Sequence, residues 1–268
     1  MPSPNRRTTV SAPAVDAAAL SRAVHDGQLV AWYQPIIDLS TGSAVGVEAL
    51  ARWPRPEGMI APAEFIPLAE ASDLVIELDL AIIRHALADL RRWQRTRPGF
   101  ELSINLSGRH LDSPTGVTEL VAMVEAASVA PGTICVELTE TTRPDAADQG
   151  APALEALRAA GMSVWLDDFG AGFYNLRDLI RLPVDGIKID REFTAQLEHP
   201  RAAPLIGALT TAAHQMGLRV TVEGVETTAQ ADVVARLGCD LGQGYLWSRP
   251  LPVDELEGWL SAAPAASE

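Results

Sequence analysis

Short stretches in which polar and apolar residues alternate recur along the chain and are separated by longer amphipathic stretches. The first pattern predicts strands, and apolar positions three and four residues apart predict helices. The predicted strands span residues 30–37, 44–53, 102–107, 134–139, 164–169, 186–190, 220–225 and 244–247. The predicted helices span residues 74–93, 117–127, 153–160, 204–216 and 227–237. This order favours an α/β fold, a TIM (β/α)8 barrel in which crossover helices join parallel strands.

The first two predicted strands depart from a regular barrel. Only the turn at residues 38–43, with Thr41 and Gly42 at its tip, separates them. A crossover between parallel strands needs about a dozen residues, so these two strands are expected to be antiparallel. The sequence therefore predicts a modified TIM barrel with one antiparallel strand near the N-terminus.

The ends of the chain differ in composition from its middle. Residues 1–19 and 261–268 are rich in small residues and proline, and we expect mobile tails there. No linker interrupts residues 20–260, which are expected to form a single barrel domain. No sensory or cyclase segment is evident in the 268 residues, so the chain is either a stand-alone domain or part of a longer protein.

Composition and charge narrow the class of protein. Hydrophobic residues make up 47% and charged residues 21%, as in ordinary globular proteins. No apolar run reaches the roughly 18 residues needed to span a bilayer, and we expect a cytoplasmic protein. The net charge of −14 argues against a long nucleic acid as partner. It does not exclude a small anionic substrate, because a bound cation can reverse the local field.

Polar side chains mark one face of the predicted strands. Residues two apart share a face, so Glu48 lies with Leu50 and Arg52, opposite Val47 and Ala49. In a barrel the aliphatic face packs on the helices, and polar groups near the carboxyl ends of the strands converge at one end. The convergent set is Glu48, Asn105, Glu137, Asp167, Asp168, Lys188 and Glu223.

So many carboxylates in one place require cations or protons. Two like charges about 4 Å apart repel by roughly 4 kcal/mol at an effective dielectric constant of 20. Oxygen ligands without histidine or cysteine indicate Mg²⁺ or Mn²⁺. Asp167 and Asp168, adjacent at a strand end, could bridge two ions about 3.5–4 Å apart, the usual arrangement for phosphodiester hydrolysis.

Each of these residues alone has an ordinary structural explanation. Glu48 and Arg52 could form an ion pair on one face, and Lys188 could be a counter-ion. Asp167 and Asp168 could belong to a polar turn, and Glu223 could be a solvated strand end. Their joint occurrence on the non-aliphatic face of successive strands favours a site.

The motifs that contain these residues closely resemble those of the EAL-domain family of cyclic di-GMP phosphodiesterases. The resemblance runs from about Leu29 to Pro252. The motifs occupy residues 33–38, 48–53, 105–107, 137–140, 167–170, 188–190, 223–227 and 243–246. The resemblance implies hydrolysis of cyclic di-GMP to the linear dinucleotide pGpG in bacterial second-messenger signalling. It also implies Mg²⁺ or Mn²⁺ as cofactor, with two ions per site.

The resemblance also implies a role for each matching residue. The first metal would be bound by Glu48, Asn105, Glu137 and Asp167. Asp167 would bridge to a second ion, which Asp168 also binds, and Glu223 would be either a further metal ligand or the general base. The residues implied near the reacting water are Lys188, which orients it, and Gln243; Glu140 would brace the loop after Asp168. The residues implied in substrate binding are Gln34, Arg52, which holds a phosphate oxygen, and Asp190.

The loop after Asp168 departs from the family pattern. Ala171 and Phe173 are mild changes, whereas Tyr174 and Asn175 replace two serines. In the family this loop shapes the second metal site and a homodimer contact. The substitutions therefore leave an alternative, a non-catalytic receptor that binds cyclic di-GMP and signals through a partner protein. A third alternative, an unrelated Mg²⁺-dependent barrel enzyme, is disfavoured by the order of the motifs.

Overall fold

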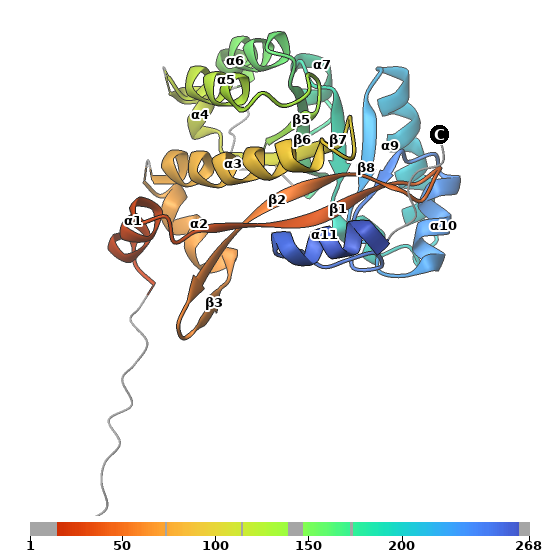
Figure 1. The fold of residues 1–268 in the computed structure, drawn as a ribbon. Helices are drawn as coiled ribbons and strands as arrows, with labels where there is room; N and C mark the ends of the chain where they lie inside the picture. The colour runs from red at the N-terminus through yellow and green to blue at the C-terminus, as the bar shows by residue number, and fades with distance from the viewer. Residues whose placement is uncertain (1–14, 73, 114, 139–146, 172–173, 263–268) are drawn as a thin grey trace, which may run out of the picture.

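The strands form a closed barrel surrounded by helices in the computed structural model (Figure 1), which describes residues 15–262 apart from 73, 114, 139–146 and 172–173. The sheet order is β1-β9-β8-β7-β6-β5-β4-β2-β3, and pairing of β1 with β2 closes the barrel. The strands are β1 Val30–Asp38, β2 Ala44–Arg55, β3 Gly58–Ile60, β4 Glu101–Leu106, β5 Ile134–Leu138, β6 Ser163–Phe169, β7 Gly186–Ile189, β8 Arg219–Val222 and β9 Leu241–Gly242. The expected modified TIM barrel is confirmed.

Strand β1 is antiparallel to both of its neighbours, β2 and β9. The turn that joins β1 to β2 is stabilised by Asp38 Oδ1, which accepts hydrogen bonds from the backbone N–H groups of Ser40 at 2.8 Å and Thr41 at 2.9 Å. Gly42 follows with φ 71°, a conformation that glycine adopts without strain. The short turn therefore reverses the chain as expected, and it places Gln34 opposite Glu48.

The eighth barrel strand lies earlier than predicted. Strand β9 is Leu241–Gly242, whereas the expected strand at residues 244–247 was wrong. Residues 244–247 form a turn instead, in which Trp247 N–H donates to the Gly244 carbonyl at 3.3 Å. A Cβ atom at Gly244 would lie 2.0 Å from the Val225 carbonyl oxygen, so two backbones cross here too closely for a side chain. Strand β3, which forms a hairpin with the end of β2, was not predicted.

The helices cover the outside of the barrel. They are α1 Ala17–His25, α2 Pro62–Glu70, α3 Leu74–Trp93, α4 Arg109–Asp112, α5 Gly116–Ala127, α6 Ala147–Ala159, α7 Asp178–Arg181, α8 Arg191–Ala195, α9 Ala202–Gln215, α10 Thr228–Arg236 and α11 Val253–Ala262. The five predicted helices correspond to α3, α5, α6, α9 and α10. Helix α1 includes residues 17–19, which composition had assigned to a tail, because Asp16 caps it by accepting from Ala19 N–H at 2.7 Å. In the part of the chain that the structure describes, no helix is long and apolar enough to cross a membrane.

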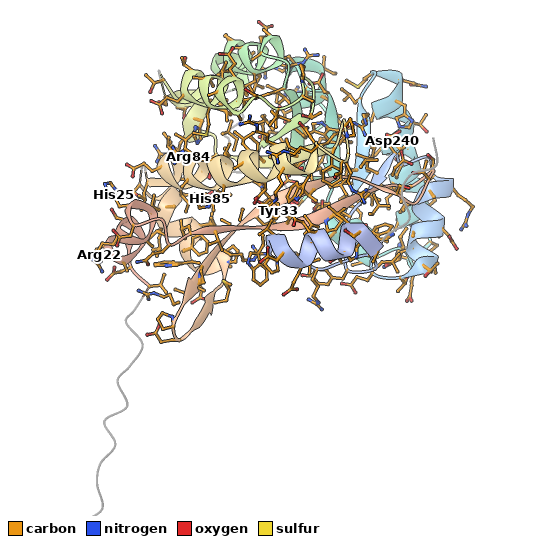
Figure 2. The ribbon with its side chains drawn as sticks, viewed as in Figure 1. Arg22, His25, Tyr33, Arg84, His85 and Asp240 are labelled. Carbon is orange, nitrogen blue, oxygen red and sulfur yellow. The ribbon has the colours of Figure 1, made fainter. Side chains whose placement is uncertain are left out.

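Buried side chains join the barrel to its helices. Leu102, Ile104 and Leu106 of β4 are buried in the main hydrophobic core. Tyr33 of β1, labelled in Figure 2, donates from its hydroxyl to Asp89 of α3 at 2.5 Å. A separate small cluster of Ile36, Cys135, Trp165 and Leu241 packs together. The outward faces of the strands are thus apolar, whereas the inward face carries both this small apolar cluster and the polar side chains.

Candidate active site

The carboxyl ends of the parallel strands bring the predicted polar residues together. Asn105 of β4 and Glu137 of β5 are direct neighbours in the sheet register. Asp167 and Asp168 lie near the end of β6, and Glu223 follows β8 directly. Neighbouring parallel strands end at the same edge, so residues far apart in the sequence meet there.

Lys188 of β7 lies at the centre of four carboxylates. Its Nζ is 2.7 Å from Glu223, 2.9 Å from Glu137, 2.9 Å from Asp167 and 3.4 Å from Glu48. The residue is 1% exposed. Burial alone would lower the pKa of Lys188, but the surrounding carboxylates outweigh burial and raise it well above its ordinary value. The lysine is therefore held as a cation.

One lysine does not neutralise the acidic residues. Burial, followed by repulsion from neighbouring carboxylates, raises the pKa of Asp168 to about 7 and that of Glu223 to about 8. Burial is also the largest cause of the raised pKa values of Glu137 and Asp167. Glu48 behaves differently: burial would raise its pKa, but Lys188 and hydrogen bonds from neighbouring amides lower it. Without cations, the protein thus binds protons at this site near neutral pH.

The arrangement fits divalent cations. Asp167, Asp168 and Glu223 each offer a carboxylate oxygen within 4.8 Å of the others. Asp167 Oδ1 is buried, and among the described residues its close partner is the Lys188 ammonium at 2.9 Å. With all acids ionised, five carboxylates and one lysine give −5 + 1 = −4. Two divalent ions would balance this charge.

Asp168 has a strained backbone. Its φ of 48° lies in the left-handed region, which is uncommon for residues other than glycine. Such conformations cost about 1–3 kcal/mol and are concentrated at functional sites. The conformation turns the chain immediately after Asp167, so two consecutive residues both contribute oxygens to the same cluster.

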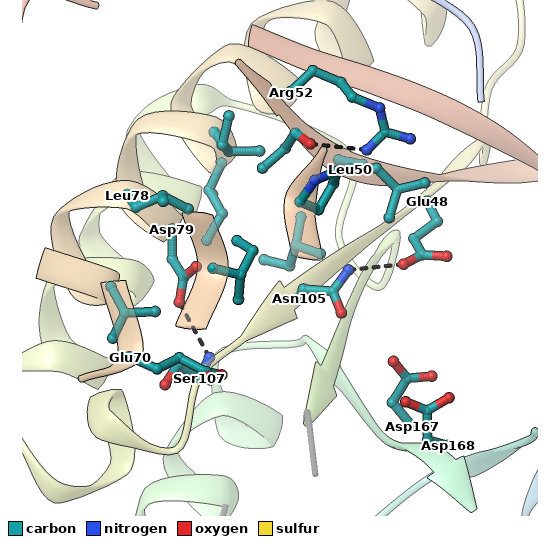
Figure 3. Close-up of a pocket in the computed structure, with 18 residues that line it drawn as sticks. Glu48, Leu50, Arg52, Glu70, Leu78, Asp79, Asn105, Ser107, Asp167 and Asp168 are labelled. Carbon is teal, nitrogen blue, oxygen red and sulfur yellow. Dashed lines mark hydrogen bonds between the residues drawn. The ribbon is translucent and has the colours of Figure 1, made fainter. Parts of the chain in front are cut away.

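Two cavities meet at Glu48 and Leu50. The first, about 310 Å³, extends from Glu48 and Asp167 to helices α2 and α3 (Figure 3). The second, about 160 Å³, is lined by Gln34, Glu223, Gln243 and Tyr245 among others. The carboxylate cluster therefore lies between two spaces, a larger one with a mostly apolar wall and a smaller one whose wall is about equally polar and apolar.

One residue of the first cavity was missed by sequence analysis. Asp79 of α3 lines it, and its Oδ2 accepts from Ser107 N–H at 3.2 Å (Figure 3) and contacts Nε2 of the fully buried His110 at 3.2 Å. The available signal was a carboxylate on the apolar face of the predicted helix at residues 74–93, between Val75 and Ile82. Burial is the largest cause of the raised pKa of Asp79.

The residues expected to bind substrate have different surroundings. Arg52 lines the first cavity, donates to the Ala51 carbonyl at 2.8 Å, and places its guanidinium 5.5 Å from the centre of the Trp32 ring. Gln34 lines the second cavity and hydrogen-bonds to Gln243. Asp190 lines neither; it caps α8 by accepting from Glu192 N–H at 2.8 Å, and its carboxylate contacts Asp168.

Of the unusual loop residues, Tyr174 and Asn175 line neither of these two cavities. Tyr174 is buried in the main core. Asn175 accepts from Arg177 N–H at 2.9 Å and its own N–H donates to Asp178 at 2.8 Å, so it organises the start of α7. Glu140 and Phe173, which the sequence analysis singled out, lie outside the described residues.

Comparison with known proteins decides the family. The model of the EAL domain family matches residues 17–250. The chain belongs to the EAL-domain family. In Pseudomonas aeruginosa, the cyclic di-GMP phosphodiesterase PA2567 is 38% identical over 231 residues, covering 85% of this chain and 39% of that protein. The cyclic di-GMP phosphodiesterase NbdA of the same organism is 37% identical over 246 residues, covering 91% of this chain and 31% of NbdA. The chain thus spans less than half the length of these relatives.

Solved EAL structures agree with the fold. The complex of the PaMucR phosphodiesterase with cyclic di-GMP matches with a TM-score of 0.83 and 35% identity, over 89% of this chain and 98% of that one. The EAL enzyme Bd1971 bound to cAMP and cyclic di-GMP matches with a TM-score of 0.84 and 32% identity, over 91% of this chain and 69% of that one. The EAL barrel is therefore the frame in which the carboxylate cluster lies.

Proposed function

We propose that this EAL domain hydrolyses cyclic di-GMP to pGpG with two Mg²⁺ or Mn²⁺ ions. The observation that carries the proposal is the cluster of five carboxylates and one lysine between two cavities, whose charge of −4 two divalent ions would balance. Bound at these oxygens, such ions would supply positive charge to the scissile phosphate and lower the pKa of a water molecule. The names of the relatives support cyclic di-GMP as substrate.

Residues of this chain are assigned to the metal site by their oxygens. Asp167, Asp168 and Glu223 form one group, which favours Glu223 as a ligand over a role as general base. The second group is built around Glu48: Asn105 Nδ2 donates to Glu48 Oε1 at 2.8 Å, which leaves Asn105 Oδ1 as a donor atom for a cation. Glu137 completes this group next to Asn105 in the register.

Lys188 and Arg52 are assigned different tasks. In the reaction, water oxygen attacks the phosphorus atom, the bond from phosphorus to the 3′-oxygen breaks, and that oxygen takes up a proton. Lys188, at the centre of the cluster, is placed to donate a hydrogen bond to the attacking water. Arg52 lies at the wall of the larger cavity, where its guanidinium fork suits a phosphate oxygen.

The larger cavity fits a purine base. Its wall is mostly aliphatic, and Asp79, which is far from Lys188 in the sequence, contributes a carboxylate to it. Guanine carries N–H donors on its Watson–Crick edge, and a carboxylate accepts such donors. Asp79 Oδ2 is already held by Ser107 and His110, which leaves Oδ1 for the ligand.

Product formation tests the proposed function. Purified protein incubated with cyclic di-GMP and Mg²⁺ or Mn²⁺ should release pGpG, and excess chelator should abolish the release until metal is restored. Glu48→Ala should abolish turnover, whereas Glu57→Ala, an exposed residue between β2 and β3, should not change it. Tight binding of cyclic di-GMP without any hydrolysis would instead favour the receptor function. Full activity in excess chelator would exclude the metal-dependent reaction.

We also propose that the segment after Asp168 forms a homodimer contact. Leu176 is 60% exposed and Ile180 of α7 is 80% exposed, and both are large apolar side chains. Ile180→Asp should convert a dimer to a monomer in light scattering after size exclusion, whereas Met59→Asp, at an exposed site in β3, should not. A wild-type monomer at all concentrations would exclude this contact.

A further inference from the structure

Two groups that can only accept hydrogen bonds fix the orientation of two glutamine amides in the barrel. The Ser248 carbonyl oxygen accepts from Gln34 Nε2 at 3.2 Å. The Glu48 carboxylate accepts from Gln243 Nε2 at 2.7 Å. A carbonyl oxygen or a carboxylate has no proton to donate, so both glutamines must turn their nitrogen atoms toward these partners.

The orientations imposed by Ser248 and Glu48 determine the hydrogen bond between the two amides. Gln34 Nε2 faces Ser248, so Gln34 Oε1 faces Gln243, whose Nε2 donates to it at 3.1 Å. Gln243 thereby uses both N–H groups, one on Glu48 and one on Gln34. A flipped Gln243 would direct its oxygen at two acceptors and lose both bonds.

The fixed orientation leaves one atom of Gln243 available. Gln243 is 3% exposed, and its Oε1 is buried and has no hydrogen-bond partner among the described residues. A buried acceptor without a partner costs about 1–3 kcal/mol. Gln243 lines the smaller cavity together with Glu223 and Glu48, so its side chain lies at the edge of the carboxylate cluster.

We propose that Gln34 is a positioning residue that acts through Gln243 and not through the substrate. Gln34 and Glu48 together hold both N–H groups of the Gln243 amide, so that its Oε1 stays available as an acceptor. This differs from the substrate-binding role that the family resemblance implied for Gln34. The inference rests on the proposed function, because its consequence for rate requires hydrolysis of cyclic di-GMP.

Kinetics and binding separate the two roles of Gln34. Gln34→Met keeps the length of the side chain but removes both hydrogen bonds, and it should lower kcat about tenfold, since one neutral hydrogen bond contributes up to about 1.5 kcal/mol. The dissociation constant for cyclic di-GMP, measured with Ca²⁺ in place of Mg²⁺ to prevent turnover, should change less than about twofold. Gln28→Met, at an exposed position before β1, is the matched control and should change neither.

A double-mutant cycle tests whether Gln34 acts through Gln243. In the Gln243→Met background, Gln34→Met should lower kcat by less than about twofold, because the amide that it positions is gone. If the losses of kcat in the two single variants multiply in the double variant, the proposal is wrong. A roughly tenfold weaker binding of cyclic di-GMP by Gln34→Met would also overturn it. Thermal unfolding of each variant identifies any loss of rate that comes from misfolding.

An NMR measurement tests the same contact without turnover. The side-chain amide signal of Gln243 is assigned by its loss in Gln243→Met, and hydrogen exchange of this signal should become about tenfold faster in Gln34→Met, which frees one N–H. Unchanged exchange would overturn the proposal even if the enzyme is active. A wild-type protein without hydrolytic activity would end the proposed function, and the exchange rates would still decide whether Gln34 orders Gln243.

Discussion

Lys188 Nζ lies 2.7 Å from Glu223 Oε1, and the two side chains come from neighbouring strands at the same end of the barrel. The same nitrogen contacts three further carboxylates, so a single cation is shared by four acids. Removing one partner of a buried ion pair leaves charge uncompensated and costs about 3–5 kcal/mol. We therefore expect the lysine to affect both the proposed reaction and the stability of the metal-free protein.

Substitution of Lys188 should affect turnover more than binding. Lys188→Met keeps the aliphatic stem but removes the donor to water, and kcat should fall about 100-fold or more while the dissociation constant for cyclic di-GMP changes little. The measurement is steady-state kinetics with binding titrations at matched metal concentration. Arg52→Ala serves as the comparison, and it should weaken binding about 10-fold to 100-fold because its phosphate contact exists before the reaction. Equal losses of binding in both variants would make Lys188 a phosphate ligand.

The two adjacent aspartates should differ in their contribution. In the proposed site Asp167 bridges two ions, so Asp167→Asn should weaken binding of both and lower turnover about 1,000-fold. Asp168→Asn should weaken one ion, and activity should recover in part at high Mn²⁺. Metal titration by calorimetry counts the ions bound to each variant. Small and equal losses of turnover in Asp167→Asn and Asp168→Asn would contradict the bridging arrangement.

The metal-free protein should lose stability as the pH rises. The folded protein holds the pKa of Glu223 at about 8 instead of 4.5 and that of Asp168 at about 7 instead of 3.8. Between the ordinary and the raised pKa values, the folded state binds more protons than the unfolded chain. Unfolding therefore becomes easier as the pH rises from about 4 to 8. In chelator, Tm should fall by roughly 3 °C per pH unit in this window. Glu223→Gln should reduce the slope, and Mg²⁺ should raise Tm more at pH 8 than at pH 5.

Asp79 should determine which base is bound. Asp79→Ala removes the acceptor for guanine N–H groups and should weaken binding of cyclic di-GMP about 10-fold to 100-fold, with a much smaller effect on cyclic di-AMP. Competition binding of the two dinucleotides measures this ratio. Glu77→Ala, on the exposed face of the same helix, is the control. An unchanged preference for guanine would exclude Asp79 from base recognition.

Periodicity predicted the parts of the fold in which one strand face is apolar over several residues. The pattern around Glu48 and Lys188 was clear because aliphatic neighbours alternate with them on buried strands. Strand β9 was placed wrongly because it is only Leu241–Gly242, too short for any alternation, and its pairing with β1 and β8 is not encoded locally. Asp79 was missed for a related reason. A single carboxylate on an apolar helix face can be recognised as part of a site only once the fold shows Ser107 and His110 next to it.

The hairpin of β1 and β2 places Gln34 directly opposite Glu48, whereas β1 meets β9 over only two residue pairs, Ile37 with Gly242 and Asp38 with Leu241. Strand β1 must therefore wait for β9, the last strand of the barrel, before the barrel can close. Until then Glu48 and Lys188 can already be neighbours, but Gln243 is missing from the cluster. A partly folded barrel would thus collect its acidic groups before it gains the chain of amide hydrogen bonds from Ser248 to Glu48, so that completion of the site depends on the docking of its last strand.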